Sequence, residues 1–160
     1  MTHGRNIVDV FLQPGDIHFG GADTRIRTVL GSCVAISLWH PVRQIGGMSH
    51  CLLPSAGRTG ATDATGDMAD FDGRYVDEAV PWLLREAVRH GTRPHEYQIK
   101  LFGGGNMFIN AGTGNHADIG RKNAQLARDL LRTLGLPVCV EDVGGTVSRS
   151  LIFEVATGDV

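Results

Sequence analysis

Residues 28–54, TVLGSCVAISLWHPVRQIGGMSHCLLP, decide the fold because they read as two strands joined by a turn. Apolar residues alternate with small or polar ones over residues 34–39, and a second run covers residues 46–53. Pro41 falls at the second position of a turn over residues 40–43, where its fixed φ suits a type I turn. We therefore expect an antiparallel hairpin over this stretch.

The expected pairing places Cys33 directly opposite His50. Directly paired side chains lie on one face of a sheet with Cβ atoms about 4.5 to 5.5 Å apart, which is near the reach of a thiol–imidazole hydrogen bond. Alternation sends the apolar side chains of the hairpin to the other face, where they suit a core: Val34, Ile36, Leu38, Ile45 and Cys51. Cys51 is therefore interpreted as a packing residue.

A cysteine beside a histidine can perform nucleophilic acyl transfer. The imidazole takes the thiol proton, the thiolate attacks a carbonyl carbon, and the imidazolium then protonates the departing amine. A third polar group normally orients the base, and Thr28 is the nearest candidate. Backbone N–H groups of the turn at residues 31–33 are candidates for stabilising the oxyanion. Buried cysteines near histidines are also common in cores, so the spacing alone does not favour catalysis.

Ordered motifs extend this pattern along the chain. They begin with LGSCVAISLWHP at residues 30–41 and GGMSHCLLP at residues 46–54. They continue through Tyr75, Asp77, Ala79, FGGGNMF at residues 102–108, IGRKN at residues 119–123, DVGG at residues 142–145 and Arg149. Together these motifs resemble the CheD family of chemoreceptor glutamine deamidases. In that family the matching cysteine is the nucleophile, the matching histidine is its base and an upstream threonine completes the triad. The resemblance carries these roles onto Cys33, His50 and Thr28.

The resemblance also implies a fold, a reaction and partners. It implies a layered β-sandwich or mixed sheet with two main helices, similar to the catalytic domain of cytotoxic necrotizing factor toxins. The implied reaction converts receptor glutamine side chains to glutamate through a cysteine thioester, without cofactor or metal. The implied partners are the cytoplasmic helices of methyl-accepting chemoreceptors and a CheC-type phosphatase. Further candidates for supporting the oxyanion, the substrate or a partner are Gly31, Ser32, Ser49, Gly104, Arg121, Asn123 and Arg149.

The totals of the sequence favour a single domain over residues 1–160 that is cytoplasmic and reduced. The chain is long enough to bury a core without disulfides, and its three cysteines are an odd number. A formal net charge of −2 offers no bulk attraction for nucleic acid or an anionic membrane. We find no signal peptide, and no apolar run approaches the length of a membrane span. The 22 glycines predict many tight turns and close backbone approaches.

Two amphipathic helices are expected. Apolar residues recur at three- and four-residue spacing over residues 76–88, and Pro81 predicts a kink or a start after Tyr75. The second helix is expected to be capped by Asn115, with Asp118 in its first turn. Its expected apolar side is Ile119, Leu126, Leu130, Leu131 and Leu134.

The remaining segments are expected to form a loop, a strand and a hairpin. Residues 55–73 are small, polar and glycine-rich, which predicts a mobile surface loop that either covers the site or is a tolerated insertion. Residues 97–102 read as a strand running into three glycines, and these predict a turn with positive φ because no phosphate-binding motif is complete. Residues 137–141 and 147–155 are predicted to form one hairpin, with Cys139 in the core. Without regular βαβ alternation, this order of elements favours an α+β fold.

Four other functions stay open from the sequence. A thioester transferred to an amine would make a transglutaminase, and attack on a peptide bond would make a protease. A chain that regulates a phosphatase or a receptor by binding alone would be an adaptor, although the presence of Cys33 and His50 favours turnover. A metal module would need Cys33, His40, His50 and Cys51, but the expected alternation places Cys51 on the other face.

Overall fold

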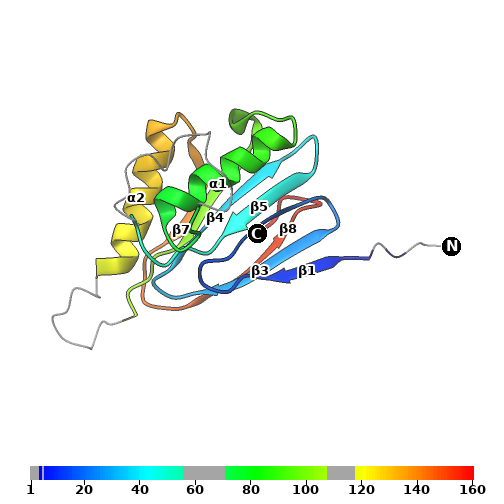
Figure 1. Cartoon of the computed structure of the whole chain (residues 1–160). Coiled ribbons are helices and arrows are strands. Elements are labelled where there is room, and N and C mark those ends of the chain that lie inside the picture. The colour runs from blue at the N-terminus through cyan, green and yellow to red at the C-terminus, as the bar shows by residue number, and fades with distance from the viewer. Residues whose placement is uncertain (1–3, 5, 56–70, 108–117) are drawn as a thin grey trace.

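Two β-sheets and a pair of helices are stacked in three layers (Figure 1). The computed structural model describes residue 4 and residues 6–55, 71–107 and 118–160. The three-stranded sheet has the order β1-β3-β8, with strands β1 (Val8–Phe11), β3 (Thr24–Leu30) and β8 (Arg149–Glu154). The five-stranded sheet has the order β2-β5-β4-β6-β7, with strands β2 (Ile17–Gly20), β5 (Ile45–Ser49), β4 (Val34–His40), β6 (Gln98–Gly103) and β7 (Val138–Val143). Helices α1 (Val76–Arg89) and α2 (Ile119–Thr133) cover the far face of the five-stranded sheet.

Both sheets are mixed. β1 runs parallel to β3, and β7 runs parallel to β6, whereas the other neighbouring strands are antiparallel. A short 3₁₀ helix, η2 (Pro94–Glu96), lies between α1 and β6. The predicted α+β architecture, with mixed sheets and two main helices, is confirmed.

The β4–β5 hairpin is present, but its register differs from the predicted one. Beyond the regular ladder, Val34 pairs with Cys51, and each of the two residues donates a backbone hydrogen bond to the other. In this register Cys33 does not lie directly opposite His50, so the predicted pairing is wrong by two residues. The two residues are diagonal neighbours across the strand pair instead.

The length of the turn explains the register. Residues 41–44 form a four-residue connection, closed by the N–H of Gln44, which donates to the carbonyl oxygen of His40 at 2.9 Å. Gln44 adopts the left-handed conformation with φ 51°. Because the shift covers an even number of residues, every side chain keeps its predicted face. The expected core set accordingly lies on the helix side of the sheet: Val34, Ile36, Leu38, Ile45 and Cys51.

A second core fills the space between the two sheets. β3 alternates strictly, and its four inward residues, Thr24, Ile26, Thr28 and Leu30, are buried. The apolar members of this core come from both sheets and their connections: Leu12, Ile26, Leu30, Ala35, Met48, Phe102, Leu151, Phe153 and Val155. Cys33 packs against this core, so the open end of the β4–β5 hairpin lies at its border.

Most of helix α1 behaves as the apolar spacing predicts, but Val88 at the end of the predicted stripe is 59% exposed. It begins at Val76, directly after Tyr75, which confirms the expected later start. Pro81 lies inside the helix. The buried face packs on the five-stranded sheet through Val76, Ala79, Val80, Leu83 and Ala87.

Helix α2 differs from its prediction at both ends. Asp118 is its cap residue and not part of its first turn, and Asn115 lies outside the described residues. Leu134 is 43% exposed and follows the last helical residue, so it does not line the apolar side. The backbone of the glycine turn at residues 103–105 lies against Gly120 and Ala124, where only small residues fit. The whole buried face of the helix is Gly120, Asn123, Ala124, Ala127 and Leu131.

β7 and β8 belong to different sheets, so the predicted hairpin of residues 137–141 and 147–155 is wrong. β7 lies beside β6 at the edge of one sheet, whereas β8 pairs with β3 in the other. Gly144 and Gly145, with φ of 82° and 72°, lie in the connection between the two sheets. Cys139 is exposed instead of buried, because it lies on an edge strand whose central residues face solvent.

Two further segments can be compared with their predictions. Gly103 and Gly104 have φ of 101° and 64°, which confirms a turn with positive φ after β6. Of the predicted loop at residues 55–73, residues 56–70 lie outside the described residues.

β2 is a strand that the sequence did not predict, and it forms an edge of the five-stranded sheet beside β5.

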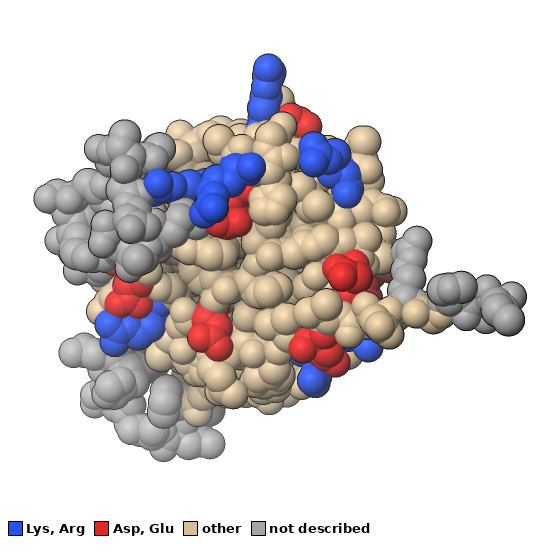
Figure 2. Space-filling view, turned by 45° about the vertical axis from the view of Figure 1, so that its right-hand side comes forward, with Lys and Arg blue, Asp and Glu red and all other residues tan. Residues whose placement is uncertain are grey.

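The surface shows charges of both signs. On the face in Figure 2, Lys and Arg side chains and Asp and Glu side chains are scattered among each other and surround a broad uncharged area. No helix in the described part of the chain is long and apolar enough to cross a bilayer.

Candidate active site

Thr28, His50 and Cys33 face the space between the two sheets, at the open end of the β4–β5 hairpin. Thr28 is an inward residue of β3 and His50 follows β5 directly; both are almost completely buried. Cys33 precedes β4, is partly exposed, and packs against the core between the sheets. Three segments of the chain thus bring a hydroxyl, an imidazole and a thiol to one border of this core.

A hydrogen bond between Thr28 and His50 fixes the imidazole. The Oγ1 atom of Thr28 lies 2.9 Å from the carbonyl oxygen of Leu12 and 2.7 Å from Nδ1 of His50. The carbonyl can only accept, so the hydroxyl proton is donated to Leu12, and Oγ1 must accept from Nδ1–H. The neutral ring therefore carries its proton on Nδ1 and its lone pair on Nε2. Within the described residues Nε2 makes no hydrogen bond, so it is free to act as a base.

The segment from Leu12 to Asp16 forms a wall of the site that the sequence did not predict. The backbone N–H of His50 donates to the Asp16 carbonyl at 3.1 Å, and the His50 carbonyl accepts from the N–H of Gly15 at 2.8 Å. With the Thr28 bond to Leu12, this segment holds both the backbone and the hydroxyl partner of the histidine. The turn residues at 13–16 were visible in the sequence, but nothing there indicated their neighbour.

The carbonyl groups of the cysteine turn at residues 31–33 are tied to the glycine turn after β6. The N–H of Gly105 donates to the Gly31 carbonyl at 3.0 Å, and the N–H of Gly104 donates to the Cys33 carbonyl at 2.9 Å. A side chain on Gly104 would place its Cβ 2.6 Å from a carbonyl oxygen of α2, and its φ is positive. Glycine is therefore required at the position that binds the Cys33 carbonyl.

Asn123 of α2 ties the third carbonyl. It is fully buried, and its Nδ2 donates to the Ser32 carbonyl at 3.2 Å and to the Leu52 carbonyl at 2.9 Å. One side chain thus connects the turn before Cys33 with the segment after His50. These two bonds give a geometry to the predicted role of Asn123 as a residue that supports the site.

The backbone N–H groups of Ser32 and Cys33 are left without carbonyl partners among the described residues. In a trans peptide the carbonyl and the following N–H point in opposite directions. Among the described residues there is no cis peptide, so each of these N–H groups points away from the bonded carbonyl of its own peptide. Two adjacent donors beside a thiol are candidates for holding an oxyanion.

Burial keeps the thiol and the imidazole neutral. Burial raises the pKa of the Cys33 thiol above its ordinary value of 9.0. Burial also lowers the pKa of His50 below 6.5, while the Asp16 charge and the Leu12 carbonyl oppose this shift less strongly. Both directions favour a neutral thiol and a neutral imidazole near pH 7. Complete burial raises the pKa of Cys51 to about 12, which excludes it as a thiolate.

The structure does not bring every candidate residue to this group. Ser49 lies on the helix side of the sheet, where its Oγ accepts from Ile36 N–H at 3.3 Å and from the Cys51 thiol at 3.6 Å. Arg149 begins β8 opposite Leu30, next to the cysteine turn, and its Nη2 lies 3.3 Å from the Asp142 carboxylate. Its Nη1 is buried without a partner in the described part of the chain.

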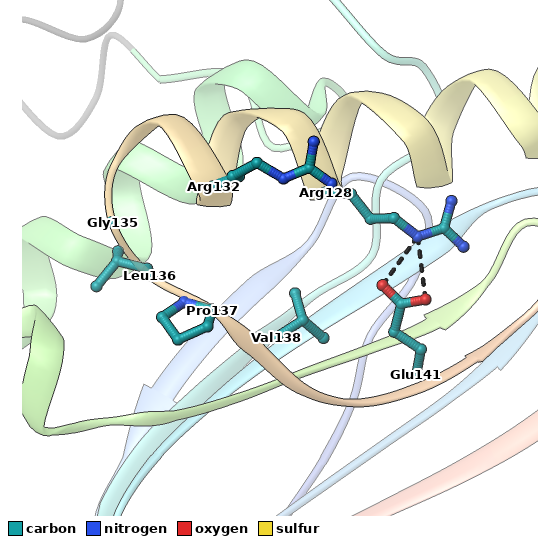
Figure 3. Close-up of a pocket in the computed structure, with 7 residues that line it drawn as sticks. All are labelled: Arg128, Arg132, Gly135, Leu136, Pro137, Val138 and Glu141. Carbon is teal, nitrogen blue, oxygen red and sulfur yellow. Dashed lines mark hydrogen bonds and ion pairs between the residues drawn. The ribbon is translucent and has the colours of Figure 1, made fainter.

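A surface hollow lies elsewhere, between the C-terminal half of α2 and β7 (Figure 3). Arg128 and Glu141 face each other across it, with Nε 2.8 Å from a carboxylate oxygen, and Pro137 and Val138 form its floor. No Cys33, His50 or Thr28 atom lines this hollow. Among the described residues there is also no group of three or more His, Cys, Asp or Glu that could hold a metal ion.

The fold and this site define a class: a layered α+β domain with a candidate cysteine nucleophile, an oriented histidine and a pair of free backbone donors. The chain belongs to the CheD family, because the family described as CheD chemotactic sensory transduction matches residues 52–160. The resemblance seen in the sequence motifs is thereby confirmed.

Relatives agree with this membership. A Dechloromonas aromatica protein named "Probable chemoreceptor glutamine deamidase CheD 3" is 47% identical over 152 residues, covering 95% of this chain and 85% of the relative. "Probable chemoreceptor glutamine deamidase CheD 1" of Chromobacterium violaceum is 44% identical over 151 residues, covering 94% and 75%. Among solved structures, the Bacillus licheniformis hypothetical protein YfiH is similar with a TM-score of 0.46 and 15% identity, covering 79% of this chain and 49% of that chain.

Proposed function

We propose that this chain is a protein-glutamine deamidase that converts glutamine side chains of chemoreceptor cytoplasmic helices to glutamate. The observation that carries the proposal is the hydrogen bond between Thr28 and His50. It leaves Nε2 of the imidazole as a free base on the side of the sheet that also carries Cys33. Family membership supports the substrate class, because the relatives are named for glutamine deamidation of chemoreceptors.

The proposed reaction begins when His50 Nε2 takes the Cys33 thiol proton and Sγ bonds to the amide carbon. The carbonyl π electrons move to the oxygen and form a tetrahedral oxyanion. When the carbonyl forms again, the C–N bond breaks and the imidazolium gives its proton to the nitrogen, which leaves as ammonia. Water then attacks the thioester as Nε2 takes its proton, and collapse of this second tetrahedral intermediate breaks the C–S bond while the imidazolium returns the proton to Sγ. One water is consumed, and glutamate and ammonia are the products.

The oxyanion would be held by the N–H groups of Ser32 and Cys33. Support comes from the anchored carbonyls of the turn, which direct both donors away from the scaffold. Gly31 and Gly104 contribute through this anchoring. Arg149 is a proposed substrate contact, supported by its place beside the turn and by its buried Nη1, which has no partner among the described residues.

The proposed partners follow from the same reaction. Each deamidation adds one negative charge to a receptor helix, which changes like-charge repulsion between neighbouring helices. We also propose a CheC-type phosphatase as a second partner, supported by the resemblance to the family alone. A cytoplasmic location would follow from the position of the substrate helices. The likeness to the catalytic domain of cytotoxic necrotizing factor toxins stays a proposal, supported by the order of the three layers.

The proposal is tested by peptide mass spectrometry of a receptor cytoplasmic fragment after incubation with wild type, Cys33→Ala or Cys51→Ala. Wild type and Cys51→Ala should add about 1 Da at defined glutamines, and Cys33→Ala should add nothing. An unchanged fragment that still binds folded wild type would support the adaptor instead. A parallel reaction with methylamine separates the other enzymes: an amide of the added amine indicates a transglutaminase, and a cleaved backbone indicates a protease.

A further inference from the structure

Asn123 is the one buried side chain of α2 whose hydrogen bonds reach the cysteine turn, among the bonds that the structure describes. It has no exposed surface, and both of its bonds are donated from Nδ2 to backbone carbonyls, those of Ser32 and Leu52. Gly120, three residues earlier in α2, lies against the backbone of Gly104 and Gly105. This part of the helix therefore cannot move away from the glycine turn, which in turn binds the cysteine turn, without opening that contact. The amide is therefore held at a fixed distance from the cysteine.

The Ser32 carbonyl and the Cys33 N–H belong to the same peptide group. Because this peptide is trans and planar, the direction of the carbonyl sets the direction of the N–H. The bond from Asn123 directs the carbonyl toward α2, so the N–H of Cys33 points to the opposite side. If the carbonyl lost this partner, the peptide could rotate, and the N–H would no longer be fixed.

The chemistry of the side chain fits this task. An uncharged amide supplies two N–H donors in one plane, and it can bind two carbonyls at once. An aspartate cannot donate, and a lysine would bring a charge into a buried place. The Oδ1 atom of Asn123 is buried without a partner among the described residues, although burial of an unpaired acceptor is unfavourable.

We propose that Asn123 is a positioning residue that orients the Cys33 N–H for the oxyanion by holding the Ser32 carbonyl. This inference rests on the proposed deamidation. It separates two tasks in the site: the Thr28–His50 pair controls the proton, and Asn123 controls the direction of the donor that receives the negative charge.

The test compares Asn123→Ala with Gln125→Ala as a matched control. Gln125 carries the same amide on the exposed side of the same helix, where its Nε2 donates to Asp129 at 2.9 Å. Asn123→Ala should lower kcat for ammonia release from a receptor fragment by about 10²-fold or more, as loss of an oxyanion donor does, with KM nearly unchanged. Gln125→Ala should keep the wild-type values.

Alkylation of Cys33 by iodoacetamide distinguishes positioning from general damage. Alkylation needs the thiolate but forms no oxyanion, so its pH profile in Asn123→Ala should match wild type. A kcat equal to wild type would overturn the proposal. A profile shifted together with kcat would also overturn it, because Asn123 would then act through the whole site. Failure of wild type to release ammonia would instead remove the deamidase function.

A measurement on wild type covers the case in which Asn123→Ala does not fold. A peptide with an aldehyde in place of the glutamine side-chain amide should form a hemithioacetal with Cys33. NMR should then show scalar coupling between Asn123 Nδ2 and the Ser32 carbonyl carbon, and a downfield shift of the Cys33 amide proton on trapping. Absence of the coupling, or a Cys33 amide proton that does not shift, would overturn the proposal.

Discussion

The two ends of the β4–β5 hairpin each carry a buried histidine, and the two rings are used differently. At the turn, Nδ1 of His40 accepts from the Arg43 N–H at 3.0 Å, and Nε2 lies 2.8 Å from the Glu96 carboxylate. At the open end, Nδ1 of His50 donates to Thr28 at 2.7 Å, and Nε2 makes no hydrogen bond with the described residues. His40 thus has both nitrogens satisfied, whereas Nε2 of His50 has no partner among the described residues, as the proposed base requires.

The two cysteines at the open end repeat this contrast. Cys51 is fully buried on the helix side, and its thiol donates to Ser49. Cys33 is partly exposed on the side of Thr28 and His50. The strand pair therefore carries one buried thiol and one partly exposed thiol, because alternation assigns them to opposite faces. The face of the sheet, and not the residue type, thus sets the surroundings of each cysteine.

Replacing each of the two histidines with alanine should give the largest difference between the two ends of the hairpin. His50→Ala removes the proposed base and should lower kcat/KM for deamidation by about 10⁴-fold. Its free energy of unfolding should change by less than the activation free energy does. His40→Ala should keep activity near wild type and lower the free energy of unfolding by about 1 to 3 kcal/mol, as loss of a buried hydrogen-bonded side chain does. Ammonia release and urea unfolding measure both. Equal losses of activity in the two variants would contradict the assignment.

The Thr28 hydroxyl should have the next largest effect. Thr28→Val removes the acceptor for Nδ1–H, so the imidazole loses its fixed tautomer and kcat should fall by about 10²-fold. Thr28→Ser keeps the hydroxyl and should retain most of the activity. Steady-state kinetics of both variants provide the test, and similar rates for Val and Ser would show that the hydroxyl has no part in orientation.

The pH dependence should show a wide plateau. Activity requires neutral His50, whose pKa is lowered by burial, so the acidic limb of kcat/KM should lie below pH 6.5. It also requires the thiol proton of Cys33, whose pKa is raised by burial, so the alkaline limb should lie above pH 9.0. An alkaline limb below pH 9.0 would instead indicate a thiolate–imidazolium pair, in which loss of the imidazolium proton sets that limb.

Stability should depend on the same histidine. Because the folded protein favours neutral His50, the unfolded chain binds more protons just below pH 6.5. The free energy of unfolding should therefore fall as the pH drops below 6.5, and this contribution should level off below the folded pKa. Urea unfolding of wild type and His50→Gln across this range isolates the contribution. An identical slope in both proteins would exclude His50 as its source.

Cys51→Ala should have the smallest effect on function. The variant loses a buried sulfur and should be less stable by about 1 kcal/mol, while kcat/KM stays near that of wild type. Thermal unfolding and ammonia release give both quantities. A large loss of activity in a folded Cys51→Ala protein would place chemistry on the helix side of the sheet and remove the contrast between the two thiols.

Local patterns predicted the faces of the hairpin but not its register. Alternation alone placed Val34 and Cys51 in the core, and a shift of two residues leaves that assignment intact. The shift itself comes from the four-residue turn, in which Gln44 adopts the left-handed conformation. A β-branched or bulky residue would disfavour this conformation, but no feature of the sequence predicts it for glutamine. The pairing of Cys33 with His50 was therefore diagonal, not direct.

Long-range contacts were beyond the reach of local patterns. β8 pairs with β3 across more than a hundred residues of chain. Neighbouring strand patterns alone therefore predict a hairpin that is absent, and they place Cys139 in the core although it lies on an exposed edge. The wall at residues 12–16 is linked to His50 by backbone groups, which carry no sequence signal. The motif at residues 119–123 predicts a supporting role for Asn123, but the burial of this side chain on a face of small residues appears only in the structure.

The most direct test of the account is the alkylation rate of each cysteine by iodoacetamide at pH 7, in wild type and in His50→Ala, read peptide by peptide. If His50 activates Cys33, the Cys33 rate should fall by about tenfold or more in His50→Ala, while the exposed Cys139 reacts equally in both proteins and the buried Cys51 stays unmodified. An unchanged Cys33 rate in folded His50→Ala would contradict the account, because the thiol and the imidazole would then not work together.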